Sequence, residues 1–220
     1  MFPLGDEERG RMITPIVTFL LVAINVVVFL IELAQPNPEA FIMRWGATPA
    51  QITAGEAWIT LITSMFLHGG WGHLLGNMVF LWVFGDNVED AFGHVLYLVF
   101  YFVCGIVASL AHIFLSPDSN VPAVGASGAI SGLLGAYILM FGSNRVRVLI
   151  GYFITTVPAY LMIGLWIVLQ FINGFASIAE TAETGGGGVA YAAHVGGFIA
   201  GLILTLVLRG FVRRPALARS

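Results

Sequence analysis

A serine and a histidine are the side chains of this sequence best suited to nucleophilic chemistry. Ser127 lies in the run Gly-Ala-Ser-Gly that begins at Gly125, and His194 lies in the run Ala-His-Val-Gly-Gly that begins at Ala193. A neutral imidazole can remove the proton of a serine hydroxyl, which then attacks a carbonyl carbon, here that of a peptide bond. Each run alone has an ordinary structural explanation, because small residues are common where membrane helices pack and a histidine at a helix end often lies at the interface. The assignment therefore depends on whether the chain brings the two residues together.

A second polar pair, His73 and Asn77, could stabilise the negative charge that such an attack creates. The two residues are four apart in the sequence, so they share one face of a helix. Together with the main chain at Ser127 and Gly128, at the start of another helix, they would form an oxyanion site. An asparagine within a membrane helix serves equally well as a hydrogen-bonding contact between helices. Both roles therefore stay open for Asn77 taken by itself.

The composition indicates that membrane-spanning helices carry these residues. Of the 220 residues, 58% are hydrophobic and 10% are charged, and the mean hydropathy is +0.92. Soluble domains carry about 25% charged residues, so an ordinary soluble protein is excluded and most of the surface must face lipid. At about 20 residues per span, the chain has room for about six spans. We therefore expect an all-α polytopic membrane protein that forms a single domain over residues 1–220.

Six apolar runs are candidate transmembrane helices. They extend over residues 13–33, 73–84, 95–115, 127–141, 148–171 and 189–208. The second and fourth runs are shorter than about 20 residues, and short spans with polar starts usually line a cavity. The first run continues without a cleavage site, so we expect an uncleaved first span and not a signal peptide.

The arginines predict the orientation of this bundle. All nine basic residues are arginines, and only Arg44 falls outside the segments that precede the first run, join the fourth to the fifth, or follow the sixth. Because cytoplasmic segments retain arginine, both termini, residues 1–12 and 209–220, should be cytoplasmic. Residues 34–72 should then form a long external loop. The Gly-rich residues 184–188 should form a flexible loop on the same external side.

Two stripes of small residues favour close contact between the fourth and sixth spans. Each stripe repeats every four residues, with Gly128, Gly132 and Ala136 on one helix and Ala193, Gly197 and Gly201 on the other. Small residues allow helix backbones to approach closely. Counted from the inner ends of their helices at 1.5 Å per residue, both Ser127 and His194 would lie about 10 Å below the outer face of a core about 30 Å thick. The two side chains can therefore meet.

Charge and cysteine content exclude several partners and chemistries. The net charge is −3 and Arg213 with Arg214 is the only basic cluster, so nucleic-acid binding is not expected. The single cysteine, Cys104, permits neither a disulfide framework nor a thiolate metal site. A zinc-dependent membrane protease would need His-Glu-x-x-His on a helix, which is absent, and an aspartyl type would need two carboxylates within the spans. We expect no metal and no organic cofactor.

The order and spacing of these motifs are similar to those of the rhomboid family of intramembrane serine proteases. The similarity covers nearly the whole chain: Trp58, His68-Gly-Gly-Trp-Gly-His73-Leu-Leu-Gly-Asn77, Gly85-Asp-Asn-Val-Glu-Asp-Ala-Phe-Gly93, Gly125-Ala-Ser-Gly128, Ala193-His-Val-Gly-Gly197 and Gly201. The resemblance implies a six-helix core with a Ser127/His194 dyad and a lipid-embedded transmembrane protein as the substrate. His73 and Asn77 would then belong to the oxyanion site.

The resemblance also implies how the bundle works. The substrate helix would enter from the side, partly unwind and be cut near the outer surface. Residues 148–171 would form the side gate, residues 173–191 would contain the cap, and His68 would support the external loop. These are expectations that the resemblance supplies and that the residue spacing alone does not.

Two positions depart from the family pattern. Ile59 follows Trp58 where the family commonly has an arginine, so the first external loop must be anchored differently. Ser131 stands four residues after the nucleophile, where the family often has an aromatic ring that stacks on the catalytic histidine. The orientation of the His194 imidazole would then rely on a hydrogen bond or on other packing.

The residues and the resemblance together predict an intramembrane serine endopeptidase that cleaves the transmembrane segments of other membrane proteins. By the resemblance, the preferred bond follows a small residue, and the protein is a multi-pass protein of the bacterial cytoplasmic membrane. The alternative is a non-catalytic rhomboid-like protein that binds client transmembrane helices without cutting them. The presence of both Ser127 and His194 favours the protease.

Overall fold

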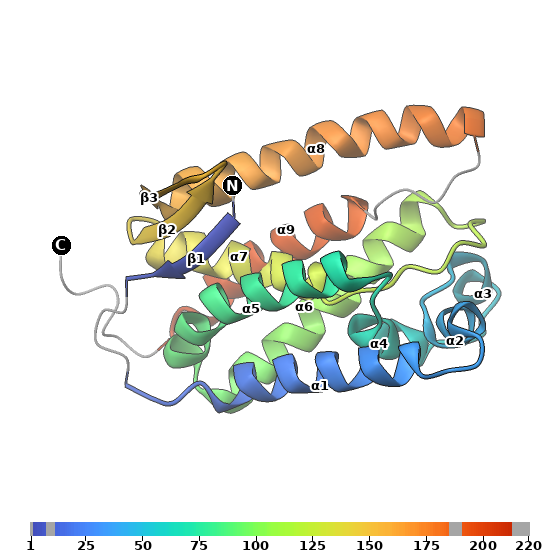
Figure 1. The fold of residues 1–220 in the computed structure, drawn as a ribbon, viewed down its shortest axis with the longest axis horizontal. Coiled ribbons are helices and arrows are strands. Elements are labelled where there is room, and N and C mark those ends of the chain that lie inside the picture. The colour runs from blue at the N-terminus through green and yellow to red at the C-terminus, as the bar shows by residue number, and fades with distance from the viewer. Residues whose placement is uncertain (1, 8–11, 185–190, 213–220) are drawn as a thin grey trace.

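The computed structural model describes residues 2–7, 12–184 and 191–212, and this part of the chain is mostly helical (Figure 1). The long helices among these residues are α1 (Ile16–Leu33), α5 (Trp71–Phe92), α6 (His94–Leu115), α7 (Ser127–Phe141), α8 (Ala159–Thr184) and α9 (Tyr191–Leu208). Short helical segments connect α1 to α5: α2 (Pro38–Trp45), α3 (Pro49–Thr53), α4 (Thr60–Thr63) and the 3-10 turn η1 (Ser64–Phe66). The strands are β1 (Phe2–Asp6), β2 (Arg145–Ile150) and β3 (Phe153–Pro158).

Helix α7 lies at the centre of the bundle and has the bounds expected for the fourth span. It packs against α5, α6, α8 and α9, and its side chains Leu133, Leu134 and Tyr137 are fully buried. Ser127 is the first residue of this helix and is half-buried. A short central helix thus places its N-terminal residue inside the bundle.

Glycines bring α7 and α9 into main-chain contact. A Cβ atom at Gly197 would overlap the carbonyl oxygen of Gly128, and a Cβ atom at Gly201 would overlap that of Gly132. Only glycine leaves room for the opposite backbone at this distance. The two stripes of small residues therefore lie at the α7–α9 contact and fix the relative height of the two helices.

Three helices of the described chain, α1, α6 and α9, are long and apolar enough to cross a membrane. Helix α7 and the first part of α8, Ala159–Ile172, are apolar but shorter. The count of six spans and the cytoplasmic placement of both termini stay predictions. Residues 8–11 and 213–220, which carry several of the arginines used for the orientation, lie outside the described residues.

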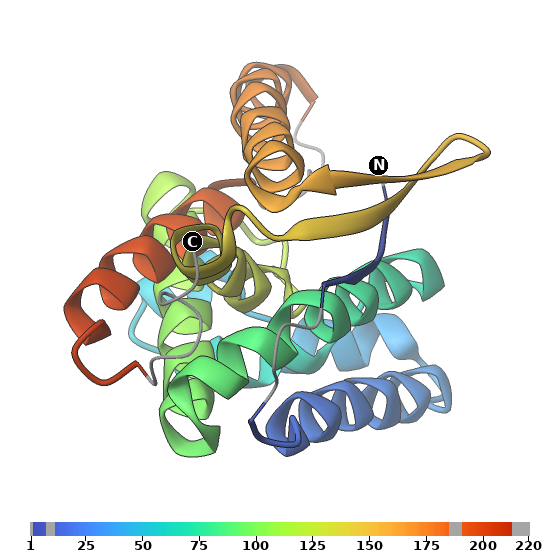
Figure 2. The same ribbon diagram turned by 90° about the vertical axis from the view of Figure 1, so that its left-hand side faces the viewer.

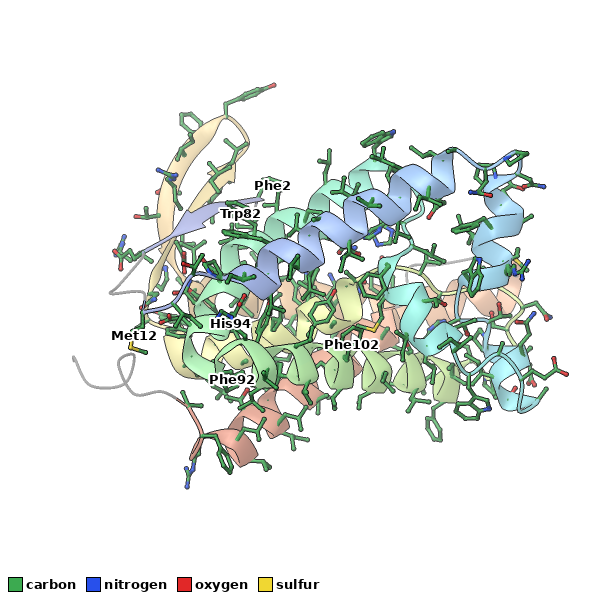
Figure 3. All side chains as sticks on the ribbon, turned by 90° about the horizontal axis from the view of Figure 1, so that it is seen from below. Phe2, Met12, Trp82, Phe92, His94 and Phe102 are labelled. Atoms are coloured by element: carbon green, nitrogen blue, oxygen red, sulfur yellow. The ribbon has the colours of Figure 1, made fainter. Side chains whose placement is uncertain are left out.

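Helix α5 extends beyond the span expected over residues 73–84 because its polar end binds the start of α1. Glu89 is fully buried and accepts hydrogen bonds from the main-chain N–H and the hydroxyl of Thr18, each at 2.7 Å. Asp90 accepts one from the main-chain N–H of Met12 at 2.8 Å, and Met12 lies at this end of the bundle (Figure 3). The Glu89 carboxylate satisfies amides that the first turn of α1 leaves free, and Asp90 binds the segment just before that turn. The acidic residues therefore extend α5 past the expected span.

The expectation of an all-α chain is wrong in one region, because the described residues contain an antiparallel sheet in the order β1-β2-β3. The fifth apolar run was expected to be helical from residue 148, but α8 begins only after Pro158. In β2, Val146 and Val148 are buried while the arginines are exposed, and this alternation is typical of a strand. Gly151, with φ +59°, opens the two-residue turn of the β2–β3 hairpin.

The connection between α1 and α5, expected as a long external loop, is folded against the bundle. Ala47, Ile52 and Leu61 form a small apolar cluster with Ile113 of α6. The side chain of Ile59 is 59% exposed, so the residue that departs from the family pattern points away from this cluster. Which side of the membrane the connection faces stays a prediction.

Helix α8 lies at one side of the bundle, and in the side view its ribbon is separate from those of α1 and α6 (Figure 2). It contacts α9, α7 and the hairpin. It continues to Thr184, so helix occupies the first part of the segment expected as the cap, residues 173–191. Residues 185–190, which include most of the expected Gly-rich loop over residues 184–188, lie outside the described chain.

Candidate active site

The structure brings Ser127 and His194 together. Nε2 of His194, in the first turn of α9, lies 2.8 Å from Oγ of Ser127 at the start of α7. His194 is 8% exposed. The glycine contacts between α7 and α9 hold the two helix starts at the same height, so the pairing follows from the packing one turn further along.

The other nitrogen of the His194 ring contacts helix α8. Nδ1 lies 2.7 Å from Oε1 of Gln170. The ring of Trp166 is tilted by 39° to the imidazole at a centroid distance of 5.9 Å, and Tyr191 meets it edge-on at 6.3 Å. Gln170 and Trp166 are not among the site residues predicted from the sequence. A polar residue inside an otherwise apolar run, four residues after a tryptophan, is the signal that could have found them.

Ser131 does not take part in orienting the imidazole. It is fully buried, and its hydroxyl donates a hydrogen bond of 2.6 Å to the carbonyl oxygen of Ser127. Ser131, which stands where the family often has a stacking ring, therefore hydrogen-bonds within the first turn of α7. The imidazole is instead contacted by Gln170 through a hydrogen bond and by the ring of Trp166, both on α8.

His73 and Asn77 of α5 border the segment that leads into α7. A Cβ atom at Gly125 would lie 2.7 Å from Nε2 of His73 and 3.5 Å from Nδ2 of Asn77. Gly125 also has φ +120°, which glycine adopts without strain. Both side chains therefore reach the main chain two residues before Ser127.

The hydrogen bonds of these two side chains leave donors free toward the site. The main-chain N–H of Gly69 donates to Nδ1 of His73 at 3.3 Å, so in the neutral ring the proton resides on Nε2, the nitrogen that faces Gly125. Nδ2 of Asn77 is buried and has no hydrogen-bond partner among the described residues. Two neutral donors without a strong acceptor are what a developing oxyanion requires.

His68 packs between His73 and Phe29. Its ring is fully buried, meets His73 at 5.1 Å and meets Phe29 edge-on at 6.3 Å. Its main-chain N–H donates to the carboxylate of Glu32 at 3.2 Å. Burial, with a smaller contribution from His73, lowers the pKa of His68 to about 4, so the ring is neutral and supports the loop as a packing residue.

The structure combines apolar helices with a serine that contacts an imidazole between them. These features place the chain among helical membrane proteins with a candidate serine nucleophile. The family model described as Rhomboid domain matches residues 55–211. The chain belongs to the rhomboid family and is an integral membrane protein.

Several curated proteins are similar to this chain. Rhomboid protease GluP of Bacillus subtilis (strain 168) is 32% identical over 199 residues, which cover 89% of this chain and 36% of that protein. RHOMBOID-like protein 5 of Arabidopsis thaliana is 32% identical over 71% of this chain and 46% of its own length. Rhomboid protease AarA of Providencia stuartii is 30% identical over 93% of this chain and 76% of its own length. The chain thus spans less than half the length of the first two relatives.

Proposed function

We propose that this chain is an intramembrane serine endopeptidase that cuts the transmembrane segments of other membrane proteins. Ser127 acts as the nucleophile and His194 as the general base. The observation that carries the proposal is the 2.8 Å contact between Nε2 of His194 and Oγ of Ser127. Membership of a family that includes named proteases supports the same activity.

The reaction proceeds through an acyl-enzyme. Nε2 of His194 accepts the hydroxyl proton while Oγ of Ser127 attacks the carbonyl carbon of the scissile bond. The tetrahedral intermediate collapses when the imidazolium gives its proton to the leaving amine. Water then attacks the ester while His194 takes one of its protons, and the second tetrahedral intermediate collapses as His194 returns that proton to Oγ of Ser127 and the acid product leaves.

The oxyanion is stabilised by neutral donors and by the start of a helix. The main-chain N–H groups of Ser127 and Gly128 lie at the positive, N-terminal end of the α7 dipole. Nε2–H of His73 and the free Nδ2–H of Asn77 supply the side-chain donors. Each such donor is worth about 100-fold or more in rate.

The substrate is a membrane helix, which reaches the site from the lipid. A helix must unwind before its carbonyl carbon can be attacked, so substrates with Gly or Pro near the cut are favoured. The preferred bond follows a small residue, a preference that comes from the family resemblance. The apolar runs and the arginines favour six spans with both termini in the cytoplasm. A bacterial cytoplasmic membrane is proposed from the family resemblance, and two of the similar proteins come from Bacillus subtilis and Providencia stuartii.

A cleavage assay with matched variants tests the proposal. Detergent-purified protein is incubated with a single-span substrate, and the wild type is compared with Ser127→Ala, His194→Ala and the exposed-site control Ser143→Ala. We expect the wild type and Ser143→Ala to cut alike and the other two variants to lose cleavage. Equal cutting by all four proteins would show that Ser127 and His194 are not the catalytic dyad. Binding of a client helix without cutting by any of the proteins would favour the non-catalytic alternative.

A further inference from the structure

Helix α8 presents two side chains to the same imidazole. Gln170 and Trp166 are four residues apart, so they lie on one face of α8. Oε1 of Gln170 lies 2.7 Å from Nδ1 of His194, and the Trp166 ring lies 5.9 Å from the imidazole. Trp166 also contacts Phe80 of α5 at a centroid distance of 6.4 Å, so it is held between the ring of Phe80 and that of His194.

Gln170 lies among apolar side chains, so its amide needs a hydrogen-bond partner. The neighbouring side chains Val168, Leu169 and Ile172 are apolar and are 51%, 46% and 58% exposed on the outside of the bundle. An amide in such a helix costs free energy unless a partner satisfies it. Gln170 is half-buried, and its amide oxygen faces a ring nitrogen of the candidate base.

We infer that Gln170 is the positioning residue of the dyad. This inference rests on the proposed function of Ser127 and His194. For Nε2 to accept the Ser127 proton, the neutral ring must carry its own proton on Nδ1, and the amide oxygen of Gln170 is the acceptor that holds it there. The hydrogen bond on one ring nitrogen thus selects the tautomer that leaves the lone pair on the other.

Gln170 fulfils this role without a charge. A carboxylate in the same place would also stabilise the imidazolium, whereas an amide orients the ring and fixes the tautomer only. Trp166 contacts the imidazole at a tilt of 39° and limits its rotation. The orientation of the base is therefore set by α8, the helix at the side of the bundle, while the nucleophile is set by α7.

Three variants separate this role from a merely structural one. Gln170→Leu removes the acceptor, Gln170→Glu restores an acceptor oxygen and adds a charge, and Gln51→Leu makes the same apolar change at an exposed residue of α3. The first measurement is nitrogen NMR of protein labelled with ¹⁵N-histidine, with the His194 signals assigned by their loss in His194→Ala. The second is the pH profile of Ser127 labelling by a small fluorophosphonate, which needs no substrate helix.

We expect the proton of His194 on Nδ1 in the wild type and in Gln51→Leu, and a mixture of tautomers in Gln170→Leu. Labelling of Ser127 should slow about tenfold or more in Gln170→Leu and recover in Gln170→Glu. The acid limb of the Gln170→Glu profile should move to higher pH, because the carboxylate stabilises the protonated, inactive imidazolium.

Either of two results overturns the inference. One is a wild-type His194 with its proton on Nε2, and the other is a set of three variants with the same tautomer and the same labelling profile. If Gln170→Leu fails to fold, the acid limb of Gln170→Glu decides alone, and an unshifted limb counts against Gln170. Failure of the proposed function has a different signature: Ser127 is then unlabelled in every protein, while the NMR measurement still reports whether Gln170 fixes the tautomer.

Discussion

Gly197 has no room for a side chain, because the carbonyl oxygen of Gly128 occupies the place where its Cβ atom would stand. This contact lies one turn from His194 on α9 and next to Ser127 on α7. The distance between the candidate base and the candidate nucleophile is thus set by a contact between two main chains, which side-chain rearrangement cannot relax.

Gly197→Ala should separate the two helices and impair both stability and activity. We expect a loss of about 1–3 kcal/mol in the free energy of unfolding and a fall of about 100-fold in kcat/KM, because a displacement of about 1 Å is sufficient for that effect. Thermal unfolding in detergent and the cleavage assay measure the two quantities. The matched control is Gly164→Ala on α8, where a Cβ atom meets nothing within 4 Å and the change should be neutral or stabilising. Full activity in Gly197→Ala would show that the close contact does not position the dyad.

Asn77→Ala should lower turnover much more than stability. Its buried Nδ2 makes no hydrogen bond among the described residues, so little is lost from the folded state, while kcat/KM should fall about 100-fold if the amide binds the oxyanion. Asn25→Ala on α1 is the comparison, because Nδ2 of Asn25 already donates to the carbonyl oxygen of Leu21 at 2.7 Å. That variant should unfold at a lower temperature and keep its specific activity. The reverse behaviour of the two variants would assign Asn77 to helix packing.

Glu89→Ala should destabilise the fold without changing the chemistry. The carboxylate accepts three hydrogen bonds from Val17 and Thr18 at the start of α1, and their loss inside the bundle should cost about 3 kcal/mol or more. The exposed Glu56→Ala serves as the control and should leave the unfolding temperature unchanged. Thermal unfolding measures both, and equal midpoints for wild type and Glu89→Ala would mean that other contacts hold α1.

The parts of the fold that the sequence could predict are those determined by helical periodicity. The bounds of α7 followed from its apolar run, and the meeting of Ser127 with His194 followed from glycines that repeat every four residues on two helices. A repeat of small residues describes a contact surface on each helix. Matching stripes on two helices therefore predict that the helices pack together, in addition to predicting each helix.

The parts that could not be predicted depend on partners far away in the sequence. Residues 148–158 are as apolar as a span, but they form the end of β2 and the whole of β3, and β2 also pairs with the distant strand β1 near the N-terminus. The acidic end of α5 was interpreted as the end of a span, because nothing in the sequence shows that Glu89 binds the amides of α1. Gln170 is one polar residue in an apolar run, and its contact with His194 on α9 becomes evident only from the folded structure.

The most direct test of the account is to identify the serine that reacts covalently. Purified protein is treated with a fluorophosphonate in detergent, and the modified residue is located by mass spectrometry. The account predicts an adduct on Ser127, a labelling rate at least about 100-fold lower in His194→Ala, and an unchanged rate in Ser143→Ala. An adduct on a different serine, or equal labelling of Ser127 in the wild type and in His194→Ala, would contradict it.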